Sequence, residues 1–217
     1  MKYLIVIPAY NEERYIASLL NNLPVVTRDI IVVDDGSKDA TYQIVQKIGI
    51  PVIRQPHQGK GAALKTGFKY AIENGYDWVI TIDGDGQHDW KDIPRFIETI
   101  SKGGADVIIG SRMADVAAMP IVRRVTNKFM SSLLSKLIGH YIADTQCGFR
   151  AINSKVLRDI VLETSHYDTE SELLIKAGRA KYNISSIPIR TIYNGSQSNI
   201  NKFVDTMRFV KLLWKAL

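Results

Sequence analysis

The 217-residue sequence lacks several features that would place it in a well-marked class of proteins. Its single cysteine, Cys147, excludes a disulfide within the chain, so no covalent cross-link holds the fold. No stretch approaches the roughly 18 consecutive apolar residues of a membrane-spanning helix. The opening stretch MKYLIVIPAYNEE has too short an apolar run for a signal peptide and no cleavage site. We therefore expect a cytoplasmic protein whose only access to a membrane is peripheral.

Internal repeats, low-complexity tracts and linkers are also absent, so we predict a single domain over residues 1–217. A chain of this length buries roughly 70% of the surface that its unfolded form exposes, which is enough for a stable core. The formal net charge is +6 and the isoelectric point is near 9.3. This moderate excess favours an anionic partner, such as nucleic acid, anionic lipid or a phosphorylated small molecule.

Short apolar runs rich in valine and isoleucine alternate with longer segments of helical pattern. Nearly continuous apolar runs suit strands that are buried on both faces, as in parallel sheets. The alternation predicts an α/β fold with a mainly parallel, Rossmann-like sheet flanked by helices. The predicted strands lie at 3–7, 30–34, 51–54, 78–82, 106–110 and 184–190. The predicted helices lie at 12–22, 39–48, 61–74, 92–101, 122–138, 154–163 and 169–179.

Polar segments follow three of the predicted strands, at Pro8–Tyr10, Asp34–Ser37 and Asp83–Asp85. In parallel α/β sheets, ligands bind beyond the carboxyl ends of the strands. We therefore expect these segments to meet along one edge of the sheet, which we call the rim. Their convergence is the first indication of a binding site.

The stretch ITIDGDGQHD places Asp83 and Asp85 two residues apart where a predicted strand ends. One interpretation is an ordinary turn, because Asp-Gly is a favoured turn dipeptide. A calcium-binding hand is excluded, since the positions that need glycine and glutamate hold His88 and Pro94. The four histidines lack the paired spacing of a zinc site. Two carboxylates with Gln87 beside them suit Mg²⁺ or Mn²⁺ that keeps open positions for phosphate oxygens.

Two further segments of the rim suit a nucleotide. In IVIPAYNEE we predict Asn11 as the N-cap of the next helix, which explains the asparagine but leaves an exposed Tyr10 unexplained. In VVDDGSKDAT a carboxylate would accept a hydrogen bond from a nucleobase N–H. We assign this role to Asp35, with Asp34 as the alternative.

Basic residues are predicted near the same edge. The stretch HQGKGAALKTG matches neither common nucleotide-binding fingerprint, yet Gly59–Gly61 with Lys60 form a basic helix start that suits an anion. The stretch IIGSR brings Arg112 to the rim, where a guanidinium pairs with phosphate through two parallel hydrogen bonds. Arg123 and Arg124 follow, with a solvated helix face as the alternative interpretation.

These motifs together resemble glycosyltransferase family 2, whose members are inverting enzymes with a GT-A fold. The matching stretches are IVIPAYNEE, IIVVDDGSKDAT, GKGAALKTG, DGDGQHD, IIGSR and DTQCGFRA, in the family's order over roughly residues 3–175. The segment GSR…MPIVRRVTNK…DTQCGFRA is similar to the acceptor side of the dolichyl- and polyprenyl-phosphate sugar transferases.

The resemblance implies a role for each matching residue. The residues that line the donor's nucleoside would be Pro8, Ala9, Tyr10 and Glu12, with Asp35 on the base. The D-x-D motif that holds Mg²⁺ or Mn²⁺ on the donor diphosphate would be Asp83 and Asp85, with Gln87 beside it. Arg112 and Arg123 match basic residues near the donor and acceptor phosphates, and we add Lys60 and Arg124. The acceptor-proximal residues would be Gln146, Gly148, Phe149 and Arg150.

The implied reaction transfers a hexose from UDP- or GDP-hexose to a polyprenyl or dolichyl phosphate, with catalysis by Asp85, Arg112 and Arg123. Such an acceptor is anionic at neutral pH, because the second pKa of a phosphate monoester is about 6. A saccharide hydroxyl, the alternative acceptor in cell-surface polysaccharide synthesis, needs a carboxylate base. A non-catalytic nucleotide-sugar-binding module is a remote alternative. The candidates for the base are Asp168, Glu170 and Glu172, and the sequence does not decide between the last two.

The segment at about 202–217 is predicted as a basic amphipathic helix, and the helix at 122–138 has the same character. Such helices lie on an anionic membrane surface or pack on the domain or a partner subunit. We expect peripheral contact with the cytoplasmic face of a membrane, with a membrane-anchored partner subunit or a homo-oligomer left open. Nucleic acid is not expected, because the aspartates of the rim repel a phosphate backbone. The predicted apolar stripe of the C-terminal helix is Phe203, Met207, Val210, Trp214 and Leu217.

Overall fold

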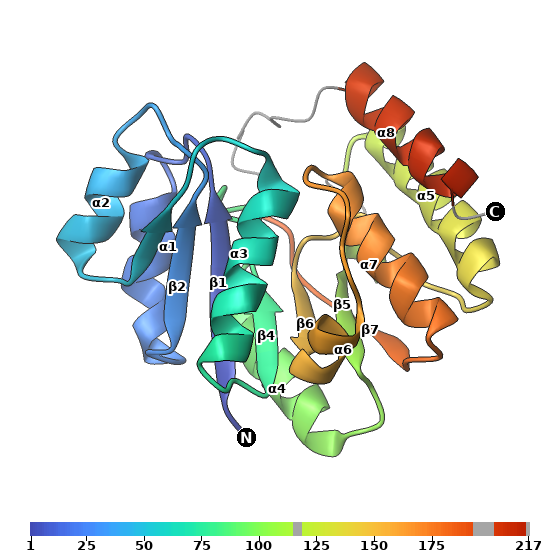
Figure 1. Cartoon of the computed structure of the whole chain (residues 1–217), viewed down its shortest axis with the longest axis horizontal. Coiled ribbons are helices and arrows are strands. Elements are labelled where there is room, and N and C mark those ends of the chain that lie inside the picture. The colour runs from blue at the N-terminus through green and yellow to red at the C-terminus, as the bar shows by residue number, and fades with distance from the viewer. Residues whose placement is uncertain (115–118, 193–201, 216–217) are drawn as a thin grey trace.

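The structure is a computed structural model that describes residues 1–114, 119–192 and 202–215. Across these residues the backbone forms a seven-stranded sheet of order β3-β2-β1-β4-β6-β5-β7 (Figure 1). Every pairing is parallel except those of β6, which runs antiparallel to β4 and β5. The strands are β1 (Tyr3–Ala9), β2 (Ile30–Asp34), β3 (Val52–Arg54), β4 (Trp78–Thr81), β5 (Val107–Ser111), β6 (Arg150–Asn153) and β7 (Ile184–Pro188).

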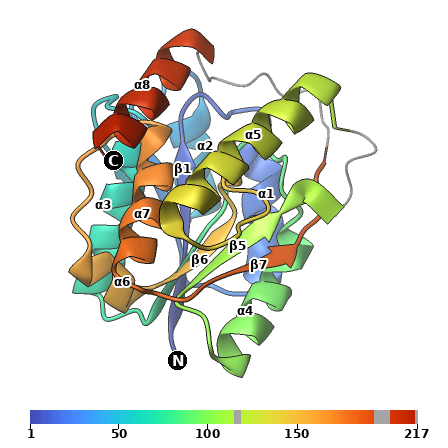
Figure 2. The same ribbon diagram turned by 90° about the vertical axis from the view of Figure 1, so that its right-hand side faces the viewer.

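Helices cover both faces of the sheet. In Figures 1 and 2, α3, α6 and α7 lie on one face, α1 and α4 lie on the other, and α5 and α8 stack beyond α7. The α-helices are α1 (Ile16–Asn22), α2 (Thr41–Ile48), α3 (Lys60–Glu73), α4 (Ile93–Lys102), α5 (Ile121–Ile138), α6 (Ser154–Asp159), α7 (Asp168–Arg179) and α8 (Lys202–Lys215). The short 3₁₀ helices are η1 (Leu23–Val25), η2 (Trp90–Asp92) and η3 (Arg112–Ala114).

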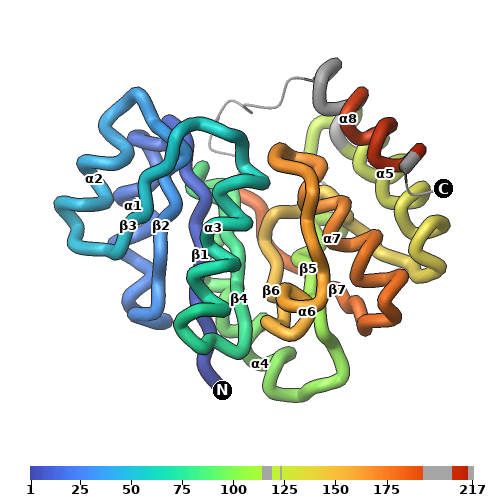
Figure 3. The backbone as a smooth tube through the Cα atoms, viewed as in Figure 1, coloured from blue at the N-terminus to red at the C-terminus, as the bar shows by residue number. Residues whose placement is uncertain are grey.

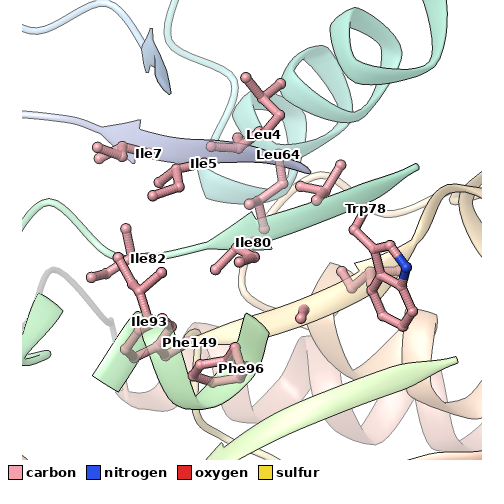
Figure 4. Close-up of a cluster of buried hydrophobic side chains, with 14 of the residues drawn as sticks. Leu4, Ile5, Ile7, Leu64, Trp78, Ile80, Ile82, Ile93, Phe96 and Phe149 are labelled. Carbon is pink, nitrogen blue, oxygen red and sulfur yellow. The ribbon is translucent and has the colours of Figure 1, made fainter. Parts of the chain in front are cut away.

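The core sits where β1 and β4 pair in the middle of the sheet. Leu4 and Ile5 of β1, together with Ile80 of β4, are buried among side chains from the flanking helices (Figure 4). Phe96 of α4 stacks against Phe149 at a centroid distance of 4.5 Å. Strands buried on both faces require apolar residues at consecutive positions, which explains the continuous runs in the sequence.

The order of the strands changes direction between β1 and β4, and we call the region beyond the carboxyl ends of these two strands the crevice. The chain places β2 and β3 on one side of β1 and then returns to place β4 on the other side, as the tube in Figure 3 shows. Ligands of open α/β sheets bind at such a switch point. The predicted convergence is confirmed there, because the Asp35 N–H donates to the Ala9 carbonyl at 2.9 Å and a methyl group on Gly84 would lie 3.4 Å from Glu12 Cγ.

The predicted helix at 12–22 begins only at Ile16, and Asn11 is not its N-cap. Asn11 has a φ of 57°, in the left-handed region that asparagine tolerates better than most residues. Its Oδ1 accepts a hydrogen bond from the Lys38 N–H at 2.8 Å, and its own N–H donates to Ser37 Oγ at 3.0 Å. The predicted cap is therefore wrong, and Asn11 instead ties the turn after β1 to the turn after β2.

Strand β6 is absent from the predicted strands. It has four residues, RAIN, and an arginine at its start interrupts the apolar pattern that marks its neighbours. Its antiparallel direction pairs Arg150 with Thr81, the last residue of β4. The residues before Arg150 therefore lie at the rim, beside the aspartates that follow β4.

Candidate active site

The D-x-D aspartates follow β4 in a tight turn at the rim. Gly86 has a φ of 69°, which favours glycine, and Asp85 Oδ1 accepts a hydrogen bond from the Gln87 N–H at 2.9 Å. The turn interpretation of the Asp-Gly dipeptides is therefore correct as far as the backbone is concerned. The same turn carries Asp83 and Asp85 into the crevice between β1 and β4, with Gln87 half-buried beside them.

Lys60 supplies a positive charge beside this turn. Its Nζ lies 2.7 Å from Asp83 Oδ1 and 3.1 Å from Glu170 Oε2. Burial disfavours its charge, but Asp83 and Glu170 outweigh burial and raise the pKa of Lys60 above its usual value. Burial likewise opposes ionisation of Asp83, but Lys60 and then His88 hold its pKa well below the usual range. Asp83 and Lys60 therefore form an ionised pair.

Glu12 and Asp85 face the same crevice and repel each other. Burial, and then Asp85 and Asp83, raise the pKa of Glu12 to about 8. Burial, and then Asp83, raise the pKa of Asp85. Among the described residues no three His, Cys, Asp or Glu side chains enclose a metal position. The set nevertheless fits Mg²⁺ or Mn²⁺, because such an ion uses one or two carboxylates and completes its shell with substrate phosphates.

The raised pKa of Glu12 predicts a loss of stability as the pH rises. The folded protein keeps the carboxyl protonated up to about pH 8, whereas the unfolded chain releases the proton near pH 4.5. The stability contributed by the protonated Glu12 carboxyl is therefore complete below pH 4.5 and is lost as the pH rises through 8. Glu12→Gln should remove this dependence, so in EDTA it should raise Tm at pH 8 by ~2–4 °C, equivalent to about 1 kcal/mol after screening by solvent.

Thermal unfolding of both proteins at pH 4.5 and pH 8 would check this expectation. Glu98→Gln, on the exposed face of α4, is the matched control because the pKa of Glu98 is lowered by Lys102 rather than raised by burial. A Glu12→Gln variant that loses stability between these pH values as steeply as the wild type would contradict the expectation.

Gly148 lies against the ionised pair. Its carbonyl accepts a hydrogen bond from Thr81 Oγ1 at 2.7 Å, which holds the backbone of segment 144–149 beside β4. A Cβ atom on Gly148 would lie 2.6 Å from Asp83 Oδ2 and 2.8 Å from Lys60 Nζ. The site therefore needs glycine at this position because the backbone approaches the carboxylate and the ammonium closely.

Two residues expected to contact the acceptor are instead fully buried. The guanidinium of Arg150 donates to the carbonyls of Cys147, Thr145 and Glu170, at 2.7, 2.8 and 2.6 Å. Phe149 has no exposed surface and packs in the core. The interpretation of Arg150 and Phe149 as acceptor contacts is wrong, and Arg150 joins segment 144–149 to the start of α7.

Arg112 forms an ion pair with Asp144 of the same chain. Its Nε and Nη2 lie 2.7 and 2.9 Å from the two carboxylate oxygens of Asp144. Burial opposes both charges, but this pairing raises the pKa of Arg112 and lowers that of Asp144. The fork predicted for a phosphate is therefore occupied by Asp144, a residue that the sequence alone does not single out.

The other basic and acceptor-side residues are less enclosed. Arg124 is exposed on the first turn of α5, whereas the side chain of Arg123 lies outside the described part of the structure. Gln146 is half-buried, and its N–H donates to Asp144 Oδ1 at 3.3 Å. Of the predicted acceptor residues, Gly148 lies beside Asp83 and Lys60 in the crevice.

The structure separates the two glutamates that compete for the role of base. Residues two positions apart on a helix point in directions about 200° apart, so Glu170 and Glu172 cannot share a face. Glu170 points to Lys60 in the crevice. Glu172 is buried and accepts hydrogen bonds from the N–H groups of Glu163 and Thr164, at 2.9 Å each. Glu172 therefore fastens the loop before α7, and its assignment as a base is wrong.

Asp35 lies just after β2, beside the end of β1, and is almost fully buried. Its Oδ1 accepts hydrogen bonds from Gln55 Nε2 at 2.7 Å and from the Gln58 N–H at 3.1 Å. Its Oδ2 accepts from the Gly59 N–H at 2.8 Å and lies 2.8 Å from His57 Nδ1. This carboxylate therefore holds the loop that leads into α3.

Tyr10 lies beside Asp35 and stacks on His57, with ring centroids 4.0 Å apart and an interplanar angle of 21°. Pro8 and Ala9, which precede Tyr10, are the buried end of β1. Asp34, the alternative to Asp35, is fully buried and pairs with Arg54 at 3.2 Å. Sequence patterns do not reveal His57, because a single loop histidine carries no distinctive signal before the stack is seen.

Residues 4–161 match the family model described as Glycosyl transferase family 2. The chain belongs to glycosyl transferase family 2. This transferase is 37% identical over 213 residues to the UDP-N-acetylglucosamine--dolichyl-phosphate N-acetylglucosaminyltransferase of Methanococcus voltae, covering 87% of this chain and 85% of that protein. It is 30% identical over 203 residues to the undecaprenyl-phosphate mannosyltransferase of Micrococcus luteus, covering 87% and 83%.

A solved structure shares the fold of the transferase. Glucosyl-3-phosphoglycerate synthase of Mycobacterium tuberculosis, crystallised with Mn²⁺, UDP and phosphoglyceric acid, matches with a TM-score of 0.78 and 19% identity. The match covers 99% of this chain and 78% of that chain. The predicted GT-A architecture, with its mainly parallel sheet and flanking helices, is thereby confirmed.

Helix α8 of the transferase packs on the molecule with a different stripe from the predicted one. Phe209 and Leu212 are buried against Leu134 of α5 and Ile175 of α7. The part of the predicted stripe that the structure describes faces outward, while Phe203 and Leu217 lie outside the described side chains. The outward-facing residues are Met207, Val210 and Trp214, which are 57, 49 and 81% exposed.

The first turns of α5 also expose apolar side chains. Val125 and Phe129 are 62 and 67% exposed, and Ile121 and Val122 are more exposed still. Arg124 and Lys128 are exposed between them. Among the described residues, no helix is both long enough and apolar enough to span a bilayer. We call these exposed residues the α5 face, which consists of Ile121, Val122, Arg124, Val125, Lys128 and Phe129.

Proposed function

We propose that this family 2 transferase moves a hexose from UDP- or GDP-hexose to a polyprenyl or dolichyl phosphate, with inversion and with Mg²⁺ or Mn²⁺, at the cytoplasmic face of a membrane. The observation that carries the donor half of the proposal is the cluster of Glu12, Asp83 and Asp85 around the switch point, with Lys60 beside it. The acceptor half draws on the names of the two relatives and on the α5 face.

Each part of the crevice suits one part of the donor. Tyr10 offers an aromatic face and Asp35 a carboxylate, which suit the ring and the N–H of a nucleobase. Asp83 and Asp85 would hold the metal, which when bound neutralises the negative charge that grows on the departing diphosphate. Lys60 would share that work as a fixed positive charge at the start of α3.

A phosphate acceptor agrees with the state of the carboxylates in the crevice. Glu170 is engaged by Lys60, and Glu172 is engaged by the loop before α7. A phosphate monoester ionises near pH 6 and needs no base to become a nucleophile. Arg124 and Lys128 on the α5 face would instead attract its charge. A saccharide hydroxyl is the alternative acceptor, for which Glu170 would have to leave Lys60 and act as base.

An assay with a panel of donors tests the proposal directly. The 217-residue chain would be mixed with UDP- or GDP-linked glucose, mannose or N-acetylglucosamine and with a polyprenyl phosphate in vesicles. Each reaction would run with Mg²⁺, with Mn²⁺ and with EDTA, and the anomeric configuration of the product would be read by NMR. We expect one donor to give a glycolipid of inverted configuration only when a metal is present.

Other results of this assay would redirect the proposal. Transfer that also occurs in EDTA would exclude a role for a metal at Asp83 and Asp85. Donor consumption with a soluble saccharide, but not with the lipid phosphate, would favour the hydroxyl acceptor. Donor binding without transfer to either acceptor would support a nucleotide-sugar-binding module.

The α5 face is the surface that we propose for membrane contact. Figure 2 shows the N-terminal end of α5 at the same end of the molecule as the carboxyl ends of the strands. Exposed Val125 and Phe129 would insert among the lipid chains, while Arg124 and Lys128 would meet anionic headgroups. This arrangement would bring a lipid-anchored phosphate to the crevice without a membrane-spanning helix.

Replacing Val125 and Phe129 together with aspartate should weaken binding to vesicles of anionic lipid at least tenfold. Burial of such side chains contributes roughly 1.5–3 kcal/mol each, and the new charges add repulsion from the headgroups. Co-sedimentation with vesicles of anionic and of neutral lipid would measure the effect. Transfer to a water-soluble, short-chain acceptor should be retained, because neither residue lies in the crevice.

The matched control is Val25→Asp, which changes a valine in η1 that is more exposed than either residue and lies outside the α5 face. Equal vesicle binding by the double variant and the control would contradict membrane contact through α5. A double variant that binds vesicles normally but no longer self-associates in sedimentation would instead show that a second copy of the chain covers this face.

A further inference from the structure

His57 holds the position that a nucleobase needs in the proposed donor site. Its imidazole is stacked on Tyr10, with 4.0 Å between ring centroids and 21° between ring planes. Its Nδ1 lies 2.8 Å from Asp35 Oδ2. Stacking on an aromatic ring and hydrogen bonding to a buried carboxylate are the two contacts by which Tyr10 and Asp35 would recognise a base.

The contacts of Asp35 show why the His57 imidazole and a nucleobase cannot both bind this carboxylate. An ionised carboxylate has about four acceptor positions. In the structure, Gln55, Gln58 and Gly59 donate to three of them. His57 Nδ1 lies 2.8 Å from Oδ2, beside the fourth, and makes a hydrogen bond with the Asp35 backbone carbonyl at 3.1 Å. The first three donors belong to the loop that leads into α3, and their loss would release that loop. His57 is the one whose place a ligand could take at little structural cost.

The surroundings of His57 allow its side chain to leave while its backbone stays. Its backbone N–H group packs closely on Gly36, because a Cβ atom there would lie only 2.8 Å from the His57 nitrogen. The next two N–H groups, of Gln58 and Gly59, are held by Asp35. The imidazole itself is half exposed, so it can rotate into solvent.

We infer that the His57 imidazole occupies the base subsite of the free transferase and rotates out when a nucleotide binds. This inference rests on the proposed function, because it takes Tyr10 and Asp35 as the base pocket. A base that enters must break the stack of His57 on Tyr10 and displace His57 Nδ1 from the Asp35 carboxylate, which lowers the apparent affinity by the fraction of molecules in which the pocket is filled. His57 is therefore a specificity-determining residue that favours bases able to replace both contacts.

The test compares a ligand that has a base with one that does not. Isothermal titration in the presence of Mg²⁺ would give Kd values for UDP, GDP and inorganic pyrophosphate with the wild type and with His57→Ala. We expect the variant to bind the better of the two nucleotides about 3–10-fold more tightly, since the base gains its contacts without displacing a ring. Its affinity for pyrophosphate should equal that of the wild type.

A conservative variant and a spectroscopic reading add to the test. His57→Asn keeps a hydrogen-bond donor but has no ring to stack, so its Kd for the nucleotide should lie between those of the wild type and His57→Ala. In the wild type, the His57 Cε1–H resonance should lose the ring-current shift from Tyr10 when the nucleotide binds, but not when pyrophosphate binds. His140→Ala, at an exposed site after α5, is the control and should leave all Kd values unchanged.

The possible results separate this inference from the proposed function. Nucleotide affinity that is unchanged or weaker in His57→Ala would overturn the inference while leaving the proposed function in place, and a weaker affinity would show that the base stacks on the histidine. An equal gain for pyrophosphate would also overturn it, since the effect would not involve the base. Failure of both proteins to bind any nucleotide would overturn the inference and the proposed function together.

Discussion

Asp85→Asn is expected to reduce glycosyl transfer at least ~100-fold while leaving the fold intact. A bound metal contributes several kcal/mol by stabilising the charge of the leaving group, and a neutral amide is a poor ligand for it. The fold should tolerate the change because burial and Asp83 both disfavour the negative charge of Asp85. Initial rates at saturating Mg²⁺, together with thermal unfolding in EDTA, would measure both effects.

Asp89→Asn is the matched control for this prediction. Asp89 caps η2 by accepting a hydrogen bond from the Lys91 N–H at 3.1 Å, and asparagine caps a helix as well as aspartate does. The control should keep wild-type activity and stability. If Asp85→Asn retained most of the activity, or if it lost activity only because it unfolded, the metal-binding role proposed for Asp85 would be wrong.

Gly148→Ala is expected to lower activity about 100-fold, the second large effect. The added methyl group would lie 2.6 Å from Asp83 Oδ2 and 2.8 Å from Lys60 Nζ, so one or both must move. These atoms end flexible side chains, and the molecule can therefore stay folded with a change in Tm of only a few degrees. Displacement of a reacting group by about 1 Å costs roughly 100-fold in rate. Steady-state kinetics and titration with Mn²⁺ would record the loss.

Gly84→Ala provides a control within the same site. A methyl group on Gly84 would meet Glu12 Cγ and Ile16 at 3.4 Å, which is ordinary van der Waals contact. This variant should keep activity within about threefold of the wild type. Equal losses in both variants would mean that the turn tolerates no side chain of any kind, and that the close approach of Gly148 to Asp83 has no special importance.

The carboxylate pair illustrates how far a motif can be interpreted before the structure is known. Asp83 and Asp85 after an apolar strand predict both a turn and a cation site, and the structure contains the turn while placing both carboxylates in the crevice. Spacing along the chain decides such local geometry. The pairing of Asp83 with Lys60 brings together residues 23 positions apart, and only the packing of α3 against β1 and β4 produces it.

The charged residues of the acceptor side show where this kind of prediction fails. Arg112, Arg150 and Glu172 have the residue types that a phosphate site or a base requires, yet each is satisfied within the chain. A buried charge needs a partner whether or not it has a role in catalysis. The partner decides the role, and Asp144 is 32 residues from Arg112 in the sequence.

The sequence by itself determined the α/β class, the positions along the chain of six of the seven described strands, and the rim on which the polar motifs meet. These features follow from local causes, because hydrophobic periodicity selects strands and helices, and parallel strands share one carboxyl edge. The tertiary structure alone decided the antiparallel insertion of β6, the choice of Glu170 over Glu172 and the stack of His57 on Tyr10. Those depend on contacts between distant segments, whose geometry is set by packing of the whole core rather than by any short pattern of residues.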